Sequence, residues 1–179
     1  MTVKQSANTY CLTQDQLVMK VAEQSALLVQ YARFSYTHSM SNYKFFDHTA
    51  DIGVEVYGRT RKELFMNTAG ALFDVMIEHK AGRATAKRQK KITVEGTDVA
   101  DLLINFLREL LHLFNGEHFI TGSCEIIEFS NKKLQARLTG ESFNNKKHSI
   151  KTEIKAVTYS GATVKRVESG WKARIIFDV

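Results

Sequence analysis

The chain has 179 residues, of which 44% are hydrophobic, and this suits one globular domain with a sizeable core and room for an appended segment. It contains no proline, which excludes a proline-rich linker or recognition segment. No apolar run is long enough to span a bilayer, and the N-terminus lacks the basic-then-apolar pattern of a secretory signal. Cys11 and Cys124 lack metal-ligand spacing and are predicted to be free thiols. Together these features predict a cytoplasmic protein.

The net charge of +6 raises the question of nucleic-acid binding. Much of the positive charge lies in two runs, which are Lys80, Arg83, Lys87, Arg88, Lys90 and Lys91, and then Lys146, Lys147 and Lys151. Such runs can neutralise phosphates, but no aromatic residues are interleaved with them to stack on bases. Solvated loops are therefore favoured over an RNA-binding surface, and docking onto an acidic protein partner fits the charge equally well.

Residues 1–41 differ in pattern from the rest and are predicted to be an N-terminal extension, with the main domain at 42–179. Thr13 and Gln16 have the spacing of a helix capping box, and apolar residues then recur at roughly helical spacing. This predicts an amphipathic helix near 14–32, with a poorly ordered extension as the alternative. Met40 is an alternative start that would give the domain alone.

The pattern becomes clearer from Tyr43 onward. A short apolar run at 43–46 is followed by a turn-like segment at 47–51 and by an alternating strand at 53–57. Thr60 and Glu63 form a capping box that begins a helix. Its predicted apolar face consists of Phe65, Ala69, Leu72, Phe73 and Met76.

A basic loop leads to a strand predicted at 91–95, and Asp98 then caps a second helix. The apolar stripe of this helix consists of Leu103, Phe106, Leu107, Leu110 and Phe114. The remaining sequence alternates like antiparallel strands, predicted near 124–130, 133–140, 152–159, 163–168 and 171–178. This order predicts an α+β fold, with a mostly antiparallel sheet covered by two amphipathic helices.

The sequence lacks the usual motifs of nucleophilic and nucleotide chemistry. There is no G-x-S-x-G elbow and no glycine-rich phosphate loop. His112 and His118 lack zinc-ligand spacing and are predicted to be ordinary solvated or hydrogen-bonded side chains.

Carboxylates are the more informative group. Asp47 and Asp51 lie four residues apart in the predicted turn, and the apolar strand 171–177 runs directly into Asp178 and Val179. A buried strand would hold the Asp178 side chain beside the Val179 carboxylate, and Asp51 could bring a third carboxylate. Such a set suits a hard cation such as Ca²⁺ or Mg²⁺. From pattern alone, a turn aspartate and a polar strand end remain the favoured interpretation.

Three segments together resemble the archease family. They are Asp47–Gly53 (DHTADIG), Lys155–Tyr159 (KAVTY) with Lys147 and His148 upstream, and the terminal strand 171–179, which closes on FDV. The resemblance runs from about Tyr43 to Val179, and residues 1–41 lie outside it. One departure is Ser160, where many prokaryotic archeases have histidine after KAVTY or KAITY.

The resemblance implies a function that composition does not show. Archeases activate an RtcB-type RNA ligase, which joins RNA ends bearing a 2′,3′-cyclic or 3′-phosphate to a 5′-hydroxyl in tRNA splicing and RNA repair. They promote guanylylation of the ligase, permit repeated turnover and can broaden its nucleotide specificity. The chain is then not itself an enzyme, and it contacts RNA only through the ligase. A direct RNA-binding module and a metal-dependent hydrolase using Asp47 and Asp51 are the alternatives.

The resemblance also implies site residues. The metal ligands correspond to Asp51, Asp178 and Val179, with Asp47 as a further candidate. The expected metal is Ca²⁺, with Mg²⁺ and Mn²⁺ as alternatives. The candidates for contact with the ligase are His48, Lys155, Thr158 and Tyr159.

Overall fold

Four antiparallel strands form the larger sheet in the computed structural model, which describes residues 42–48, 51–80 and 88–179. The strands are β1 (Tyr43–His48), β2 (Asp51–Gly58), β8 (Ala156–Val167) and β9 (Gly170–Asp178). Their order in the sheet is β1-β2-β9-β8, so β9 lies between a strand from the start and a strand from the end of the described sequence. Ile175, Ile176 and Phe177 are buried, which confirms that this strand is apolar on both faces near its end.

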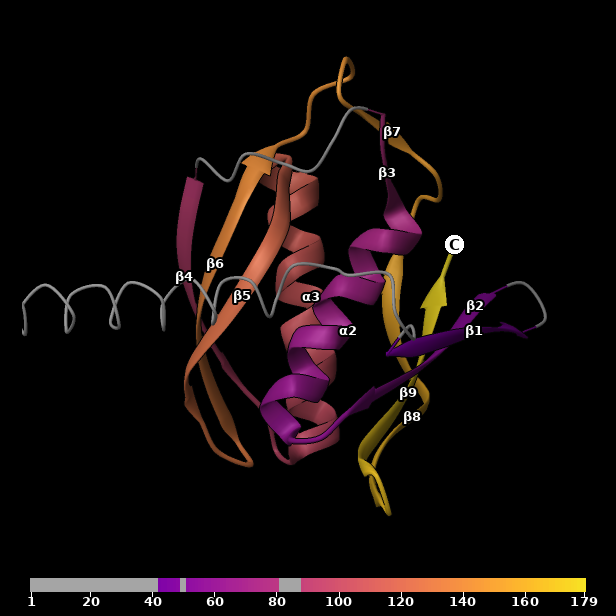
Figure 1. Ribbon diagram of the computed structural model, residues 1–179, viewed down its shortest axis with the longest axis vertical. Helices are drawn as coiled ribbons and strands as arrows, with labels where there is room; N and C mark the ends of the chain where they lie inside the picture. Colours follow the sequence, from indigo (N-terminus) through magenta and orange to yellow (C-terminus); the bar gives the residue numbers. More distant parts are fainter. Residues whose placement is uncertain (1–41, 49–50, 81–87) are drawn as a thin grey trace, which may run out of the picture. The chain divides into compact units, whose positions relative to one another are not determined.

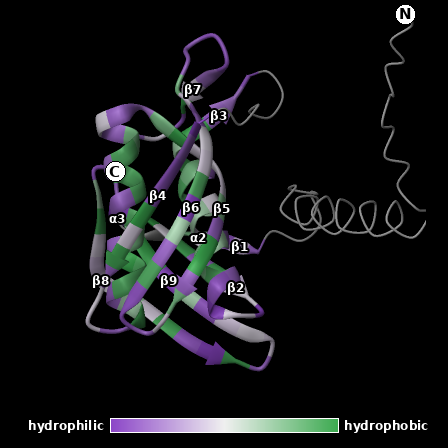
Figure 2. Ribbon diagram, turned by 90° about the vertical axis from the view of Figure 1, so that its left-hand side faces the viewer, coloured by the Kyte–Doolittle hydropathy of each residue, from purple (hydrophilic) through white to green (hydrophobic). Residues whose placement is uncertain are grey.

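A second sheet contains three antiparallel strands in the order β4-β6-β5. They are β4 (Arg88–Glu95), β5 (Phe119–Phe129) and β6 (Lys133–Ser142). Buried and exposed residues alternate along β4, and the hydropathy colouring of this sheet alternates in the same way (Figure 2). Two short strands, β3 (Ile77–His79) and β7 (His148–Ile150), pair separately as a ribbon.

Both helices begin at the side chains that the sequence predicted as caps. Helix α2 spans Arg61–Met76, and Thr60 Oγ1 accepts a hydrogen bond from the Glu63 N–H at 3.1 Å. Helix α3 spans Val99–Glu117, and Asp98 Oδ1 accepts from the Ala100 N–H at 2.8 Å. These bonds satisfy amide groups that lack a partner in the first helical turn.

The helices lie between the two larger sheets (Figure 1). Helix α2 contacts β2 and β5, and helix α3 contacts β8, β4 and β5, so each helix touches both sheets. The α+β class, the mostly antiparallel pairing and the two helices packed on sheet are confirmed, and the structure adds that the helices pack against two sheets rather than one. The reason is visible in α2, where Leu64, Phe65 and Ala71 are all fully buried, because an element packed on two sides needs more than one apolar stripe.

Several predicted boundaries differ from the structure. Within the segment predicted as a turn at 47–51, the described residues are strand, because β1 continues to His48 and β2 already begins at Asp51. The strands predicted at 152–159 and 163–168 are one strand, β8, with an irregularity between Thr158 and Thr163. Strand β4 begins at Arg88, so part of the first basic run is strand, and β5 begins as early as Phe119.

Two predictions lie outside the described residues, namely the helix near 14–32 and the thiol of Cys11. Cys124 is a free thiol, as predicted, and burial raises its pKa to about 12, so it is unreactive near neutral pH. In the part of the chain that the structure describes, neither helix combines the length and the apolar character that crossing a membrane requires.

Candidate functional site

The pairing of β2 with β9 brings two of the predicted carboxylates to one end of the larger sheet. The pairing extends to Ile52 opposite Phe177. Continuing the register by one residue places Asp51, the first residue of β2, opposite Asp178, the last residue of β9. Both residues are half-buried, and so is the adjoining Val179. Like charges held this close repel one another unless a cation neutralises them.

Lys155 supplies a positive charge at the same end of the sheet. Its backbone N–H donates to the Asp178 carbonyl oxygen at 2.8 Å, and its Nζ donates to the Val179 oxygen at 2.9 Å. Its side chain is otherwise exposed. The candidate site residues Asp178, Val179 and Lys155 are therefore joined by hydrogen bonds, although the lysine comes from the segment before β8.

Asp47 and His48 belong to β1 rather than to a loop. In the β1–β2 hairpin Asp47 lies opposite Ile52, and His48 lies opposite Asp51. The predicted loop containing both aspartates is thus corrected, since Asp47 lies in β1 and Asp51 in β2. His48 is therefore the direct cross-strand neighbour of Asp51, and Asp47 is not.

Thr158 and Tyr159 lie where β8 departs from regular pairing. Thr158 Oγ1 donates to the Ile176 carbonyl oxygen at 3.4 Å, which fixes it to β9. The register then shifts before Thr163, and Gly161 within this bulge has a φ of 67°, a conformation that favours glycine. The bulge turns Tyr159 toward helix α3.

The Tyr159 ring is 52% exposed, but its hydroxyl is already bonded within the chain. The hydroxyl lies 2.8 Å from Asp101 Oδ1 and 3.2 Å from Asn105 Oδ1, and the Arg108 guanidinium lies 4.4 Å from the ring centroid. The bond to Asp101 raises the pKa of Tyr159. A partner would therefore meet the ring of Tyr159 rather than its hydroxyl.

A hollow of about 300 Å³ adjoins Asp51. It is lined by residues that include Phe45, Phe46, Asp74 and Lys151. The Arg174 guanidinium lies 4.3 Å from the Phe46 ring centroid, and Phe45 is 50% exposed. The pattern at 43–46 was interpreted only as a strand. Adjacent phenylalanines on a strand point to opposite faces, and this was the available indication that one of them lies on the surface.

Comparison with known proteins decides the family. The profile of the archease protein family matches residues 43–179. The chain belongs to the archease family. It is 38% identical over 144 residues to the protein archease of Pyrococcus furiosus, covering 78% of this chain and 100% of that protein. It is 33% identical over 141 residues to the archease of Methanosarcina acetivorans, covering 76% and 95%.

Solved structures agree with this assignment. The solution structure of Methanobacterium thermoautotrophicum protein 1598 matches with a TM-score of 0.62 and 32% identity, covering 78% of this chain and 100% of that one. A Thermotoga maritima archease, described as a possible chaperone, matches with a TM-score of 0.50 and 22% identity, which supports the fold alone.

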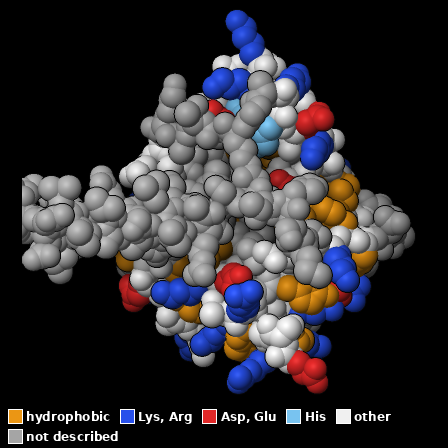
Figure 3. Space-filling view, viewed as in Figure 1, with side chains coloured by type: hydrophobic (Ala, Val, Ile, Leu, Met, Phe, Trp, Pro, Cys, Tyr) orange, Lys and Arg blue, Asp and Glu red, His pale blue; other side chains and the backbone are white. Residues whose placement is uncertain are grey.

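The two basic runs are partly neutralised within this archease. Arg88 and Lys90 both pair with Glu117, at 3.2 and 2.6 Å, and Lys147 lies 3.8 Å from Glu141. In the part of Figure 3 that is not grey, lysine and arginine side chains lie among acidic and apolar groups. These pairs reduce the charge available to phosphates, so they weaken the RNA-binding interpretation.

The hydroxyl bond of Tyr159 gives a first testable prediction. In Tyr159→Phe the carboxylate form of Asp101 loses one donor, so the lowered pKa of Asp101 is expected to rise toward its usual value. The rise is partial, because the backbone N–H of Thr97 contributes more to the lowering. Carboxyl-carbon NMR titration measures it, with Tyr57→Phe as the matched control. An unchanged Asp101 titration would show that the hydroxyl does not bond there.

Proposed function

We propose that this archease activates an RtcB-type RNA ligase in the cytoplasm, by promoting guanylylation of the ligase and allowing it to turn over repeatedly. The observation that carries the proposal is the meeting of the three archease-like segments at one end of the larger sheet. The segment DHTADIG supplies Asp51, KAVTY begins with Lys155, and FDV supplies Asp178 and Val179. Asp51 lies more than a hundred residues before the other two segments, and the pairing of β2 with β9 brings it to them.

The donor set fits the metal that the family implies. Asp51, Asp178 and Val179 offer oxygen atoms alone, and hard cations such as Ca²⁺, Mg²⁺ or Mn²⁺ prefer oxygen ligands. When bound, the metal would offset the mutual repulsion of the carboxylates and fix β2 to β9 at this end. We take Ca²⁺ as the expected ion, because flexible carboxylate and backbone-oxygen ligands suit its larger radius.

The residues of this archease then act by holding the end of the larger sheet in a fixed arrangement. Lys155 holds Val179 through its Nζ and Asp178 through its backbone, so it aligns the end of β9. Phe45 lines the hollow beside Asp51, and Tyr159 belongs to the segment that Lys155 begins, so these two exposed side chains are apolar groups available to a protein partner. His48 and Thr158 complete the contact candidates. The chemistry stays on the ligase, and the archease favours its reactive state.

A ligase assay tests this proposal. The cognate ligase is given RNA with a 3′-phosphate and RNA with a 5′-hydroxyl, with and without one archease per roughly ten ligase molecules. We expect the ligase to go from about one turnover to many. Ligated RNA that stays stoichiometric with the ligase after the archease is added would contradict the proposal.

The same assay separates the alternatives. A direct RNA-binding module would bind the RNA in the absence of ligase, with affinity that falls steeply as salt rises. A metal-dependent hydrolase would turn over substrate as the isolated protein. Neither result is expected here.

A further inference from the structure

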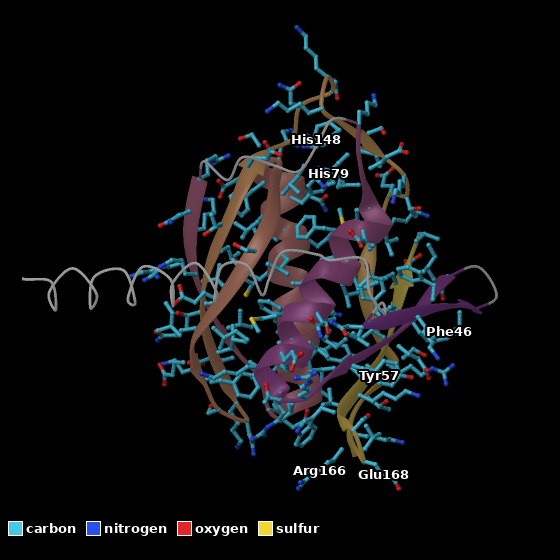
Figure 4. All side chains as sticks on the ribbon, viewed as in Figure 1. Phe46, Tyr57, His79, His148, Arg166 and Glu168 are labelled. Carbon is cyan, nitrogen blue, oxygen red and sulfur yellow. The ribbon has the colours of Figure 1, made fainter. Side chains whose placement is uncertain are left out.

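Three side chains with metal-ligating atoms converge where the β3–β7 ribbon meets the end of β6. His79 comes from β3, Glu141 from the end of β6 and His148 from β7. His79 and His148 are register partners in the β3–β7 ribbon, with ring centroids 5.1 Å apart. Figure 4 shows the two rings side by side, away from the labelled Phe46 of the β1–β2 hairpin. These three residues are not among those of the carboxylate site.

Their spacing is close to what a tetrahedral metal needs. One ligand atom from each residue lies within 4.8 Å of the other two, and His148 Nε2 lies 3.0 Å from Glu141 Oε1. With metal–nitrogen bonds of about 2.0–2.1 Å, tetrahedral ligand atoms are about 3.4 Å apart. The closest pair is therefore already near the required separation, and His79 is on the surface, where its side chain can adjust.

The cluster is also within reach of solvent. His79 is exposed, and its ring lies against that of the buried His148. Glu141 lines a hollow of about 260 Å³ that is also bordered by Arg88, Ser142 and Asn144, which provides an entry path. Histidine atoms reach the surface in the upper part of Figure 3.

Metal binding would change one existing contact. His148 Nδ1 accepts a hydrogen bond from the Asn144 N–H at 3.0 Å, so Nε2 carries the proton and donates to Glu141. To use Nε2 as a ligand, the proton must move to Nδ1, and the Asn144 bond must open. Asn144 is exposed, but its carbonyl oxygen also accepts from the N–H groups of Lys147 and His148, so the bond to Nδ1 has to open while this turn is otherwise held.

We propose that His79, Glu141 and His148 form a binding site for a divalent transition metal of the zinc class. Two imidazoles and one carboxylate favour Zn²⁺ over the hard Ca²⁺, and a water completes the four ligands. The metal joins three strands, and two of them belong to a ribbon of only three residues on each side. Its effect is to fasten this short ribbon to the end of β6.

Zinc titration of the metal-free full chain, in excess Ca²⁺ to occupy the carboxylate site, tests the proposal. We expect His79→Ala to lower zinc affinity at least about tenfold, while His112→Ala, an exposed histidine of α3 outside the cluster, leaves it unchanged. Co²⁺ in place of zinc is expected to give the intense visible absorption of a tetrahedral site, and His79→Ala to remove it. Because His79 is on the surface, this variant keeps the core intact.

Two outcomes overturn the proposal. One is equal zinc affinity in the wild type and in His79→Ala, which would place any bound zinc elsewhere. The other is unchanged hydrogen exchange at the Asn144 amide on adding zinc, because the proposed geometry requires that amide to lose its bond to His148. Ligase activation is not measured, so failure here leaves the proposed function standing.

Discussion

Replacing Asp51 or Asp178 by asparagine is expected to abolish the stimulation of ligase turnover and to lower Ca²⁺ affinity at least about tenfold, or about 1.4 kcal/mol. Each change removes one negative charge from the end of the β2–β9 pair while keeping the size and shape of the side chain. The metal-free protein is expected to stay folded, because removing one of two neighbouring carboxylates relieves their repulsion.

Calorimetric Ca²⁺ titration and the turnover assay measure the two effects on the same preparations. Glu128→Gln is the matched control, since Glu128 is an exposed carboxylate of β5 outside this end of the larger sheet. Retained Ca²⁺ affinity in Asp51→Asn would refute the metal site. Lost affinity with full stimulation of the ligase would separate the metal from the function and refute their link.

The second large effect is on stability, at Gly140 of β6. A Cβ at this position would lie 2.0 Å from the Ile120 carbonyl oxygen, which is backbone and cannot turn away. Gly140→Ala is therefore expected to force β5 and β6 apart and to destabilise the fold by about 3 kcal/mol. Urea unfolding followed by circular dichroism measures the change.

Gly122→Ala is the matched control in the same strand pair. Its added Cβ would lie 3.5 Å from the Thr139 carbonyl oxygen, which is an ordinary contact. We expect this variant to change the free energy of unfolding by less than about 1 kcal/mol. Equal stability of the two alanine variants would mean that the strands separate easily at Gly140, contrary to the packing described.

The elements with strong local signals could be predicted from sequence. Thr60 and Asp98 each cap a helix through their own side chain, and this needs only residues within one turn. By contrast, helix α2 is buried on a second side because it also packs against β5, a strand distant in sequence, and no local pattern predicts that contact. The strands β3 and β7 have three residues each, too few for a two-residue period to be recognised.

The candidate site shows the same division. Asp51 alone resembles a turn aspartate, and Asp178 alone resembles a polar strand end, so pattern favoured those interpretations. Their closeness follows from the β2–β9 register, which no local pattern encodes. The resemblance to a family supplied what local reasoning could not. His79 was missed because its neighbours Glu141 and His148 come from other strands, without sequence spacing typical of metal ligands.

The β2–β9 pairing has a kinetic consequence. The β1–β2 and β8–β9 hairpins each join neighbours in sequence and can form early, but their docking closes a loop that contains both helices and the whole second sheet. The entropy of closing such a loop is lost before the contacts repay it, which makes docking slow. Asp51 and Asp178 become neighbours only at that step. Molecules with both hairpins formed but not yet docked therefore lack the site altogether, and its appearance during refolding marks the end of folding rather than its beginning.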